Sequence, residues 1–239
     1  MRFLYGLVLQ WKLDIRSKNL LITCYIVPLL FFLLMGGIFT SIMPQMKDTL
    51  IQQMIIMGVS MGAFIGLPPS LAETYGSDVK KIYIANGVPL YMPLASMFIS
   101  ALLHIIIMCC IIVITAPLIF DAALPADMSE FFIGLIIYIS ASLSVACILG
   151  LAVKSQSKLT MVQQMLFLPS IMLSGIMFPA SMLPDPLEKA GQLFPSTWGF
   201  NLLMDNGMKF QNLWYLLLVF VIAVAVISIL SVYETSIYP

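Results

Sequence analysis

Six long apolar stretches, none of which contains Asp, Glu, Lys or Arg, dominate this sequence. They are residues 20–43, 50–72, 94–120, 131–153, 159–178 and 213–232. Each is long enough to cross the hydrocarbon of a bilayer, which takes about 20 helical residues. Backbone N–H and C=O groups find no water there, so only helices and closed β-barrels are stable, and the stretches lack the alternation of barrel strands. The sequence therefore predicts an all-α integral membrane protein with six transmembrane helices, forming a single transmembrane domain over residues 1–239.

Composition and motif content exclude several classes of protein. Charged residues make up only 9% of the chain, the formal net charge is zero and no basic run occurs, so a nucleic-acid partner is not expected. Motifs for nucleotide binding, zinc hydrolysis and serine hydrolysis are absent, so we expect no catalytic, cofactor-binding or metal-binding residue in this chain. His104 lies five and six residues from Cys109 and Cys110, a spacing that does not bring three ligands onto one helix face.

The basic residues in the short connections predict the orientation, because cytoplasmic connections are richer in Lys and Arg. One side contains Arg2, Lys12, Arg16, Lys18, Lys80, Lys81, Lys154 and Lys158, whereas the other contains Lys47, Lys189 and Lys209. The sequence therefore predicts a multi-pass protein of the plasma (inner) membrane with both termini in the cytoplasm.

Residues 1–19 have an amphipathic pattern of their own. One helical stripe carries apolar side chains and another side carries basic ones, although Leu9 and Leu13 lie opposite the apolar stripe. The apolar residues are Leu4, Leu7, Val8, Trp11 and Ile15. This pattern favours a helix that lies in the cytoplasmic interface of the membrane. A simple extension of the first span is the alternative.

Two connections are longer than a turn. Residues 73–93 contain Ser77 or Asp78 as a helix cap and Gly87 as a helix end, which predicts a short cytoplasmic helix. Residues 179–211 contain three prolines among apolar residues, which predicts two short re-entrant helices that dip back toward the outer leaflet.

Glycine and methionine patterns mark the second and fifth predicted spans. Gly58, Gly62 and Gly66 are spaced four residues apart, and such glycines allow neighbouring helices to approach closely. Packing within one subunit is the favoured interpretation, with a subunit interface or a substrate path as alternatives. Flexible thioethers with nearby amides suit a path for hydrophobic substrates, although ordinary packing explains the methionines equally well. The candidate path residues are Met57, Met61, Gln164, Met165 and Met172.

Two motif regions and the overall plan of the chain resemble the type-2 ATP-binding-cassette (ABC-2 type) exporter permeases. The first region is Glu73-x-x-Gly76-x-x-Val79-Lys80-Lys81 with Ala85-Asn86-Gly87-Val88-Pro89. The second is Ser174-Gly175-x-x-Phe178-Pro179 followed by Leu183-Pro184 and Phe194-Pro195-Ser196-Thr197. An interfacial helix and six spans complete the plan, so the resemblance covers essentially the whole chain.

The resemblance implies a function and two protein partners. A separate ABC ATPase, which binds ATP and Mg, would supply the energy, and a second permease would complete a homo- or heterodimer in membrane lipid. The ATPase would dock on a coupling helix around Glu73, Gly76, Val79, Lys80, Lys81 and Gly87, and an outer gate would contain Phe178, Pro179, Phe194 and Trp198. The substrate would be amphipathic: an antibiotic, a peptide or a lipid-linked molecule.

Two other classes of function remain as alternatives. One is a stand-alone ion-coupled transporter or channel that uses His104, the one ionisable side chain within the six stretches. The other is a membrane enzyme or a passive assembly or immunity protein, for which the scattered polar residues Glu188, Lys189 and Asp205 suggest no reaction.

Overall fold

The computed structural model describes residues 2–177, 182–204 and 209–236. Helix makes up 86% of the structure, and the described residues contain no strand. Among the described residues, five helical segments are long and apolar enough to cross a membrane: Ile22–Ile42, Leu50–Gly76, Tyr91–Phe120, Met128–Ala152 and Phe210–Ser231. The predicted all-helical, multi-pass membrane fold is therefore confirmed.

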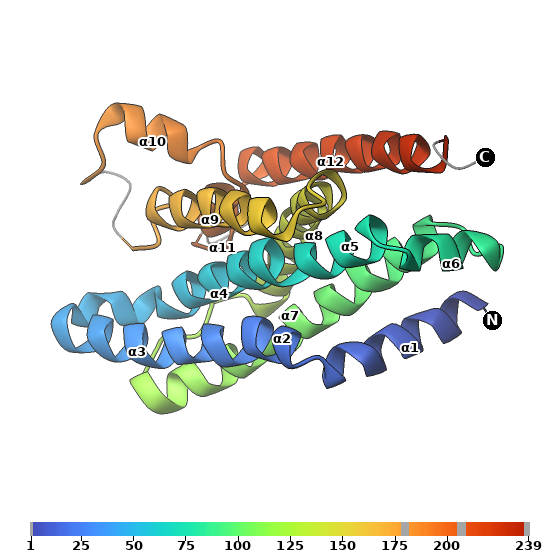
Figure 1. The fold of residues 1–239 in the computed structure, drawn as a ribbon. Helices are drawn as coiled ribbons and strands as arrows, with labels where there is room; N and C mark the ends of the chain where they lie inside the picture. The colour runs from blue at the N-terminus through green and yellow to red at the C-terminus, as the bar shows by residue number, and fades with distance from the viewer. Residues whose placement is uncertain (1, 178–181, 205–208, 237–239) are drawn as a thin grey trace.

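The helices pack as one bundle whose long members run roughly along a common direction (Figure 1). In chain order they are α1 (Arg2–Arg16), α2 (Lys18–Leu21), the π-helical turn η1 (Ile22–Ile26), α3 (Val27–Ile42), the 3₁₀ turn η2 (Pro44–Asp48), α4 (Leu50–Met61), the π-helical turn η3 (Gly62–Gly66), α5 (Leu67–Gly76), α6 (Val79–Ala85), α7 (Tyr91–Phe120), α8 (Met128–Ala152), α9 (Gln156–Met172), α10 (Asp185–Gly191), α11 (Pro195–Met204) and α12 (Phe210–Ser236).

The predicted fifth span, residues 159–178, corresponds to α9, which is shorter than each of the five segments named above. It has 17 residues, about 26 Å of helix, against about 30 Å of hydrocarbon. Helix α9 ends in a turn in which Leu173 N–H donates to the Pro169 carbonyl at 2.9 Å, and Gly175 then adopts a φ of 86°. The six-span layout therefore stays a prediction.

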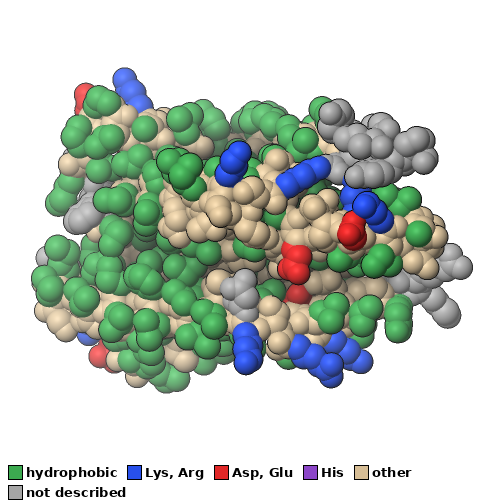
Figure 2. Space-filling model, in the orientation of Figure 1, with side chains coloured by type: hydrophobic (Ala, Val, Ile, Leu, Met, Phe, Trp, Pro, Cys, Tyr) green, Lys and Arg blue, Asp and Glu red, His purple; other side chains and the backbone are tan. Residues whose placement is uncertain are grey.

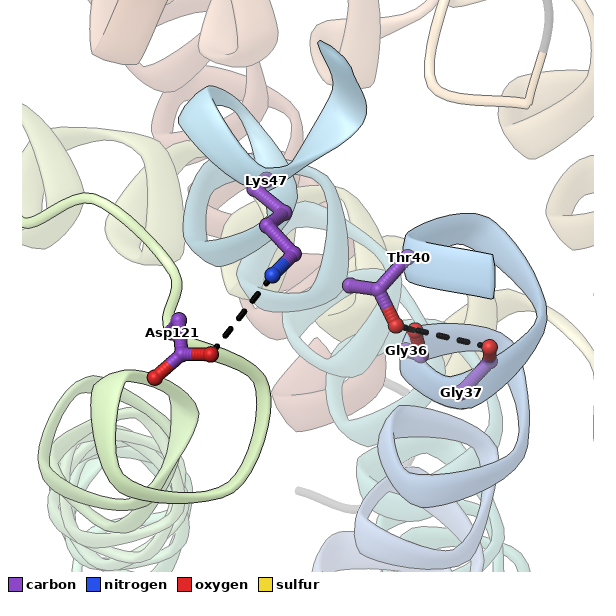
Figure 3. A network of polar contacts seen from close by, with 5 residues as sticks. All are labelled: Gly36, Gly37, Thr40, Lys47 and Asp121. Carbon is purple, nitrogen blue, oxygen red and sulfur yellow. Dashed lines mark hydrogen bonds and ion pairs between the residues drawn. The ribbon is translucent and has the colours of Figure 1, made fainter. Parts of the chain in front are cut away.

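One end of the bundle contains the connections that follow the first and third spans. Lys47 of η2 forms an ion pair with Asp121, just after α7, with 3.6 Å between Nζ and Oδ2 (Figure 3). Nearby in α3, Thr40 donates to the Gly36 carbonyl at 2.7 Å, and a Cβ on Gly36 would lie 2.6 Å from the Phe120 ring. These two connections therefore share one end, as the predicted topology requires.

The opposite end contains both ends of the described chain together with α6 (Figure 1). Here Gly76 lies against Lys154, and the Gln156 amide donates to the Pro69 carbonyl at 3.5 Å. The connections that follow the second and fourth spans therefore meet at this end. This grouping agrees with the distribution of basic residues in the sequence.

The centre of the bundle is the continuous segment α4–η3–α5. In an 18-residue apolar stretch of this span, 94% of the residues are buried inside the protein, compared with 22% in such a stretch of Ile22–Ile42 and 11% in one of Phe210–Ser231. The outer helices therefore leave broad apolar faces exposed, and hydrophobic side chains cover much of the surface in Figure 2. Such faces are unsuited to water and suited to lipid or to another membrane subunit.

Candidate functional site

The segment after α5 forms the short helix that the sequence predicts. Asp78 occupies the cap position of α6, but the backbone N–H of Val79 is held by the Ser77 hydroxyl, at 3.3 Å. Gly87 ends the turn after α6 with a φ of +65°, a conformation that favours glycine. The Tyr75 hydroxyl donates to the Leu90 carbonyl, which ties both ends of the segment together. The segment is therefore a compact helical hairpin and not a loose loop.

The predicted coupling residues differ in exposure. Glu73, Gly76, Lys81 and Gly87 are exposed, and Val79 is 40% exposed. Lys80, in contrast, is only 4% exposed. Of these two neighbouring lysines, only Lys81 therefore presents its charge on the surface of the single chain. Successive positions on a helix point about 100° apart, which separates the two side chains.

Lys81 forms an ion pair with Asp78, at 2.7 Å between Nζ and Oδ1. The hydrogen bond and the positive charge of Lys81 lower the pKa of the Asp78 carboxyl below its ordinary value of 3.8. Both side chains remain exposed to solvent, so the pair contributes little stability. It presents a fixed pair of opposite charges at the start of α6.

The predicted substrate-path residues do not share one surface. Met57 and Met61 are each 7% exposed and belong to the central core. Gln164 is exposed, and Met165 and Met172 of α9 are 65% and 53% exposed. The single chain therefore supports ordinary packing for the two methionines of α4, while α9 presents an uncovered methionine face.

Gly58, Gly62 and Gly66 contact other helices of the same chain. A Cβ on Gly58 would lie 2.7 Å from Met108, and one on Gly62 would lie 3.0 Å from Ile105, both in α7. A Cβ on Gly66 would lie 3.1 Å from the sulfur of Cys24 in η1. The glycines therefore serve close packing within the subunit, which is the favoured sequence interpretation.

The described part of residues 179–211, the segment predicted to be re-entrant, contains two short helices, α10 and α11. Phe178 and Pro179, two of the four predicted gate residues, lie outside the described residues. Phe194 is half-buried just before α11, and Trp198 stacks on Tyr215 of α12 with ring centroids 4.0 Å apart. The Trp198 indole N–H also donates to the Gln192 carbonyl at 2.7 Å. Trp198 therefore fixes α11 against both neighbouring segments.

A buried hydroxyl network fixes α11 to the centre of the bundle. Ser60 of α4 lies 2.7 Å from the hydroxyl of Tyr138 in α8 and 3.1 Å from the hydroxyl of Ser196 in α11. All three side chains are fully buried. Because a buried hydroxyl without a partner costs free energy, the network specifies where α11 sits. The sequence alone does not reveal this network, because its members are 58 to 136 residues apart.

A comparison with protein families decides the identity of the chain. The family of ABC-2 transporter proteins matches residues 40–233, which is most of the sequence. The chain belongs to this ABC-2 family. Comparisons with curated proteins and with solved structures find no match. Membrane domains of the ABC-2 family are transport subunits that have no ATPase of their own, which agrees with the missing nucleotide motif.

A polar feature of this ABC-2 chain, missed at the sequence level, is the pairing of Gln163 with η3. The Gln163 amide donates to the carbonyls of Phe64 and Ile65, at 2.8 and 3.2 Å. A π-helical turn shifts the backbone hydrogen bonds by one residue and leaves carbonyls without a helical partner. The buried glutamine satisfies these carbonyls and links α9 to the central span. The adjacent amides of Gln163 and Gln164 in an apolar stretch were the available signal.

The ABC-2 chain also buries a carboxylate that lies outside all six predicted spans. Asp14 of α1 is 7% exposed and accepts hydrogen bonds from Gln10 and from Ser100 of α7. The Trp11 ring stacks on His104, with centroids 4.2 Å apart. His104 Nδ1 lies 2.7 Å from the Tyr25 hydroxyl of the first span. Helix α1 therefore packs along the first half of α7, and His104 contacts a neighbouring helix through Tyr25.

Asp14→Asn is expected to flatten the pH dependence of stability. Burial raises the pKa of the Asp14 carboxyl above 3.8, although its hydrogen bonds oppose the shift. The native state therefore binds the proton more tightly than the unfolded state, and the free energy of unfolding falls as pH rises above 3.8. Asparagine removes this titration. The measurement is the unfolding midpoint of detergent-purified protein between about pH 4 and pH 7.

Asp127→Asn provides the control for this prediction. Hydrogen bonds from Ser129 and Glu130 lower the pKa of the Asp127 carboxyl, so its titration lies below the tested range. This control variant should keep the wild-type slope. An unchanged slope in Asp14→Asn would show that the buried carboxyl does not titrate in this range.

Proposed function

We propose that this chain is the membrane-spanning permease subunit of an ATP-driven exporter in the plasma (inner) membrane, with both termini in the cytoplasm. The observation that carries the proposal is membership of the ABC-2 family over residues 40–233. A separate ABC ATPase with ATP and Mg supplies the energy, and a second permease subunit completes the transporter. The exported substrate is amphipathic: an antibiotic, a peptide or a lipid-linked molecule.

The ATPase docks on α6 in this proposal. Two features support the site: α6 lies at the end where basic residues gather, and its Val79 and Lys81 are exposed, as is Glu73 in the last turn of α5. Short connections at Ser77 and Gly87 join α6 to α5 and α7. A force that the ATPase applies to α6 is therefore transmitted to both of these helices. Lys80 is buried in the hairpin, so its role in coupling is to position the helix, whereas Lys81 and Glu73 contact the partner.

The second permease subunit covers the methionine face of α9 in this proposal. Met161, Met165 and Met172 repeat along that face and are more than half exposed in the single chain. A substrate path that includes them therefore lies between two subunits and not inside one. Trp198 of α11 and Phe194, just before α11, border the outer exit. The hydroxyl network of Ser60, Tyr138 and Ser196 holds α11 in this position.

The docking proposal is tested by reversing the charge of Lys81. We expect Lys81→Glu to weaken the interaction with the ATPase about tenfold, because a like-charge contact costs at least as much as one lost ion pair. The measurement is the affinity of the purified, reconstituted permease for its ATPase, together with permease-stimulated ATP hydrolysis.

Lys158→Glu is the matched control, since Lys158 is exposed at the same end of the bundle but starts a different helix. The control should bind the ATPase normally. Equal affinity of Lys81→Glu, Lys158→Glu and the native chain would remove α6 from the docking surface.

A stand-alone ion-coupled transporter is the second candidate, and the cluster of Asp14 and His104 favours it. The two ionisable groups lie in one polar cluster, and the Nε2 atom of His104 is buried with no hydrogen bond in the described structure. This candidate predicts pH-dependent flux in vesicles that contain only this chain. Flux that His104→Ala abolishes without any ATPase would replace the exporter proposal.

A further inference from the structure

A groove of about 620 Å³ lies between α1, the turn after α6 and the first turns of α7. It belongs to the end of the bundle that contains α6 (Figure 1). Helix α1 runs in the same direction as α7 along the groove, because Gly6 lies beside Ser96 and Asp14 lies beside Ser100. Sites for drug-sized molecules have volumes of about 300–1,000 Å³, so the groove has the size of such a site.

The lining of the groove is mainly apolar and carries no charge. Two tyrosine rings, a thioether and several aliphatic side chains suit an aromatic ring. None of the described residues that line the groove is charged, and the basic residues of α1 are not among them. The apolar and aromatic lining residues are Tyr5, Leu9, Leu13, Tyr83, Val88, Pro89, Met92 and Pro93.

Ser96 of α7 contributes a buried hydroxyl to the lining. The residue is 5% exposed, yet its hydroxyl forms no hydrogen bond within the described part of the chain. The Ser96 Oγ atom lies near α1, because a Cβ on Gly6 would be 3.8 Å from it. Other buried serines, such as Ser60 and Ser144, donate to a carbonyl of their own helix. Because an unpaired buried hydroxyl costs free energy, a polar group in the groove would gain a hydrogen bond there.

Two amide side chains add polarity to the groove without charge. Gln10 donates through Nε2 to Asp14 at 2.8 Å, and Asn86 donates through Nδ2 to the Ile82 carbonyl at 2.7 Å. No described group donates to either amide oxygen. The groove therefore offers a few neutral hydrogen-bonding groups on an apolar surface, which is the usual pattern of a small-molecule site.

These features favour one kind of occupant over others. A hydrocarbon chain or an apolar side chain of another protein would fill the groove but would leave the Ser96 hydroxyl unpaired. A phosphate, sulfonate or carboxylate would lose its hydration without meeting a cation among the described lining residues. An uncharged molecule with an aromatic ring and a polar group satisfies both conditions.

We propose that this groove binds an uncharged, drug-sized amphiphile, with its aromatic ring against the apolar lining and one polar group hydrogen-bonded to Ser96. The site itself does not depend on the proposed exporter function. If that function is correct, which is the basis of this extension, the groove favours a neutral antibiotic-like substrate over a charged peptide or a lipid-linked molecule. Binding is measured on this chain alone, so its failure would leave the ATPase-docking test unaffected.

The test compares the neutral fluorophore N-phenylnaphthylamine with anilinonaphthalene sulfonate, which adds a sulfonate to the same aromatic skeleton. The full-length protein is purified in mild detergent, and protein-free micelles provide the blank. Native mass spectrometry counts the retained molecules, and fluorescence titration gives the affinity. We expect one saturable site per chain for N-phenylnaphthylamine. The sulfonate should bind at least about tenfold more weakly, because no cation compensates for its lost hydration.

Ser96→Ala tests the polar contact. Its affinity for N-phenylnaphthylamine should fall about three- to tenfold, the effect of one neutral hydrogen bond. The unfolding midpoint without ligand should stay the same or rise, because the variant removes an unpaired buried hydroxyl. Ser144→Ala is the matched control, since Ser144 is also a buried helical serine but bonds to the Ala141 carbonyl in α8. The control should keep the native affinity.

Gly6→Leu tests the place of binding. The new side chain would occupy the groove, and its Cβ would approach nothing closer than the Ser96 hydroxyl, at 3.8 Å. This variant should lose the saturable site while its thermal unfolding midpoint stays near that of the native protein.

Three results would overturn the proposal. Equal affinity of the native protein for the two fluorophores would show that the groove does not select uncharged molecules. Native affinity in Ser96→Ala, or an equal loss in Ser144→Ala, would remove the hydroxyl from the site. Unchanged binding in Gly6→Leu would place the molecule outside the groove.

Discussion

Gly199→Ala is expected to destabilise the protein by about 1–3 kcal/mol, because it overfills the contact between α11 and α8. An added Cβ would lie 2.3 Å from Cδ2 and 2.7 Å from Cε2 of Tyr138. The ring cannot rotate away at low cost, since Tyr138 is fully buried and its hydroxyl is bonded to Ser60 and Ser196. The measurement is the thermal unfolding midpoint of the purified protein in detergent.

Gly37→Ala is the matched control for this prediction. Gly37 is also a helical glycine, but its added Cβ would meet only the Phe120 ring, at 4.0 Å, an ordinary contact. Alanine is intrinsically the better helix former by about 1 kcal/mol. Gly37→Ala should therefore be neutral or stabilising. Equal midpoints for Gly199→Ala and Gly37→Ala would mean that α11 does not press against Tyr138.

The variant Tyr138→Leu tests whether the contact between residue 199 and Tyr138 causes the loss of stability. In Tyr138→Leu, the aromatic ring that the new methyl group would meet is absent, so Gly199→Ala should cost much less there than in the native chain. Residues in direct contact show such coupling, whereas distant sites add independently. Additive effects of the two substitutions would assign the loss in Gly199→Ala to a cause other than this contact.

Physical constraints that act along the chain made much of the fold predictable from the sequence. The bilayer sets the length of an apolar span, so the predicted stretch 94–120 lies within the helix Tyr91–Phe120 and 131–153 nearly coincides with Met128–Ala152. Local turn chemistry likewise predicted α6 and the left-handed Gly87. Such features depend on residues that are close together in the sequence, so a single sequence is enough to predict them.

Features that depend on contacts between distant helices could not be predicted in the same way. Asp14 is a polar residue in an amphipathic helix, and only its packing against Ser100 shows that it is buried. The burial of Lys80 next to an exposed Lys81 is a further example, because both belong to one basic pair in the sequence. The register of one helix against another decides these outcomes.

The tightest helix contacts also lie outside the glycine motif that the sequence singled out. Added Cβ atoms at Gly150, Gly191 and Gly199 would approach neighbouring atoms at 2.3 to 2.6 Å. Glycine spacing describes the groove on one helix, but the rigidity of the facing atoms decides how much a methyl group costs. A flexible side chain that faces a motif glycine can move, whereas a backbone atom cannot.

Gly150→Ala should therefore destabilise the protein more than Gly58→Ala, although only Gly58 belongs to the motif. At Gly150 the new Cβ would lie 2.6 Å from the Leu71 Cβ and 3.0 Å from the Pro68 carbonyl oxygen, so α5 and α8 must separate. At Gly58 the nearest atoms are the terminal methyl carbon and sulfur of Met108, at 2.7 and 3.0 Å. A methionine side chain can adopt another rotamer at small cost.

We expect a loss of about 1–3 kcal/mol for Gly150→Ala and less than about 1 kcal/mol for Gly58→Ala, measured as unfolding midpoints under the same conditions. Met108→Ile in the Gly58→Ala background sharpens the comparison, because a β-branched side chain has fewer rotamers with which to avoid the new methyl group. That double variant should be less stable than the two single effects predict. If Gly58→Ala alone is as damaging as Gly150→Ala, then Met108 is held as rigidly as backbone, and the contact at Gly58 is as tight as the contact at Gly150.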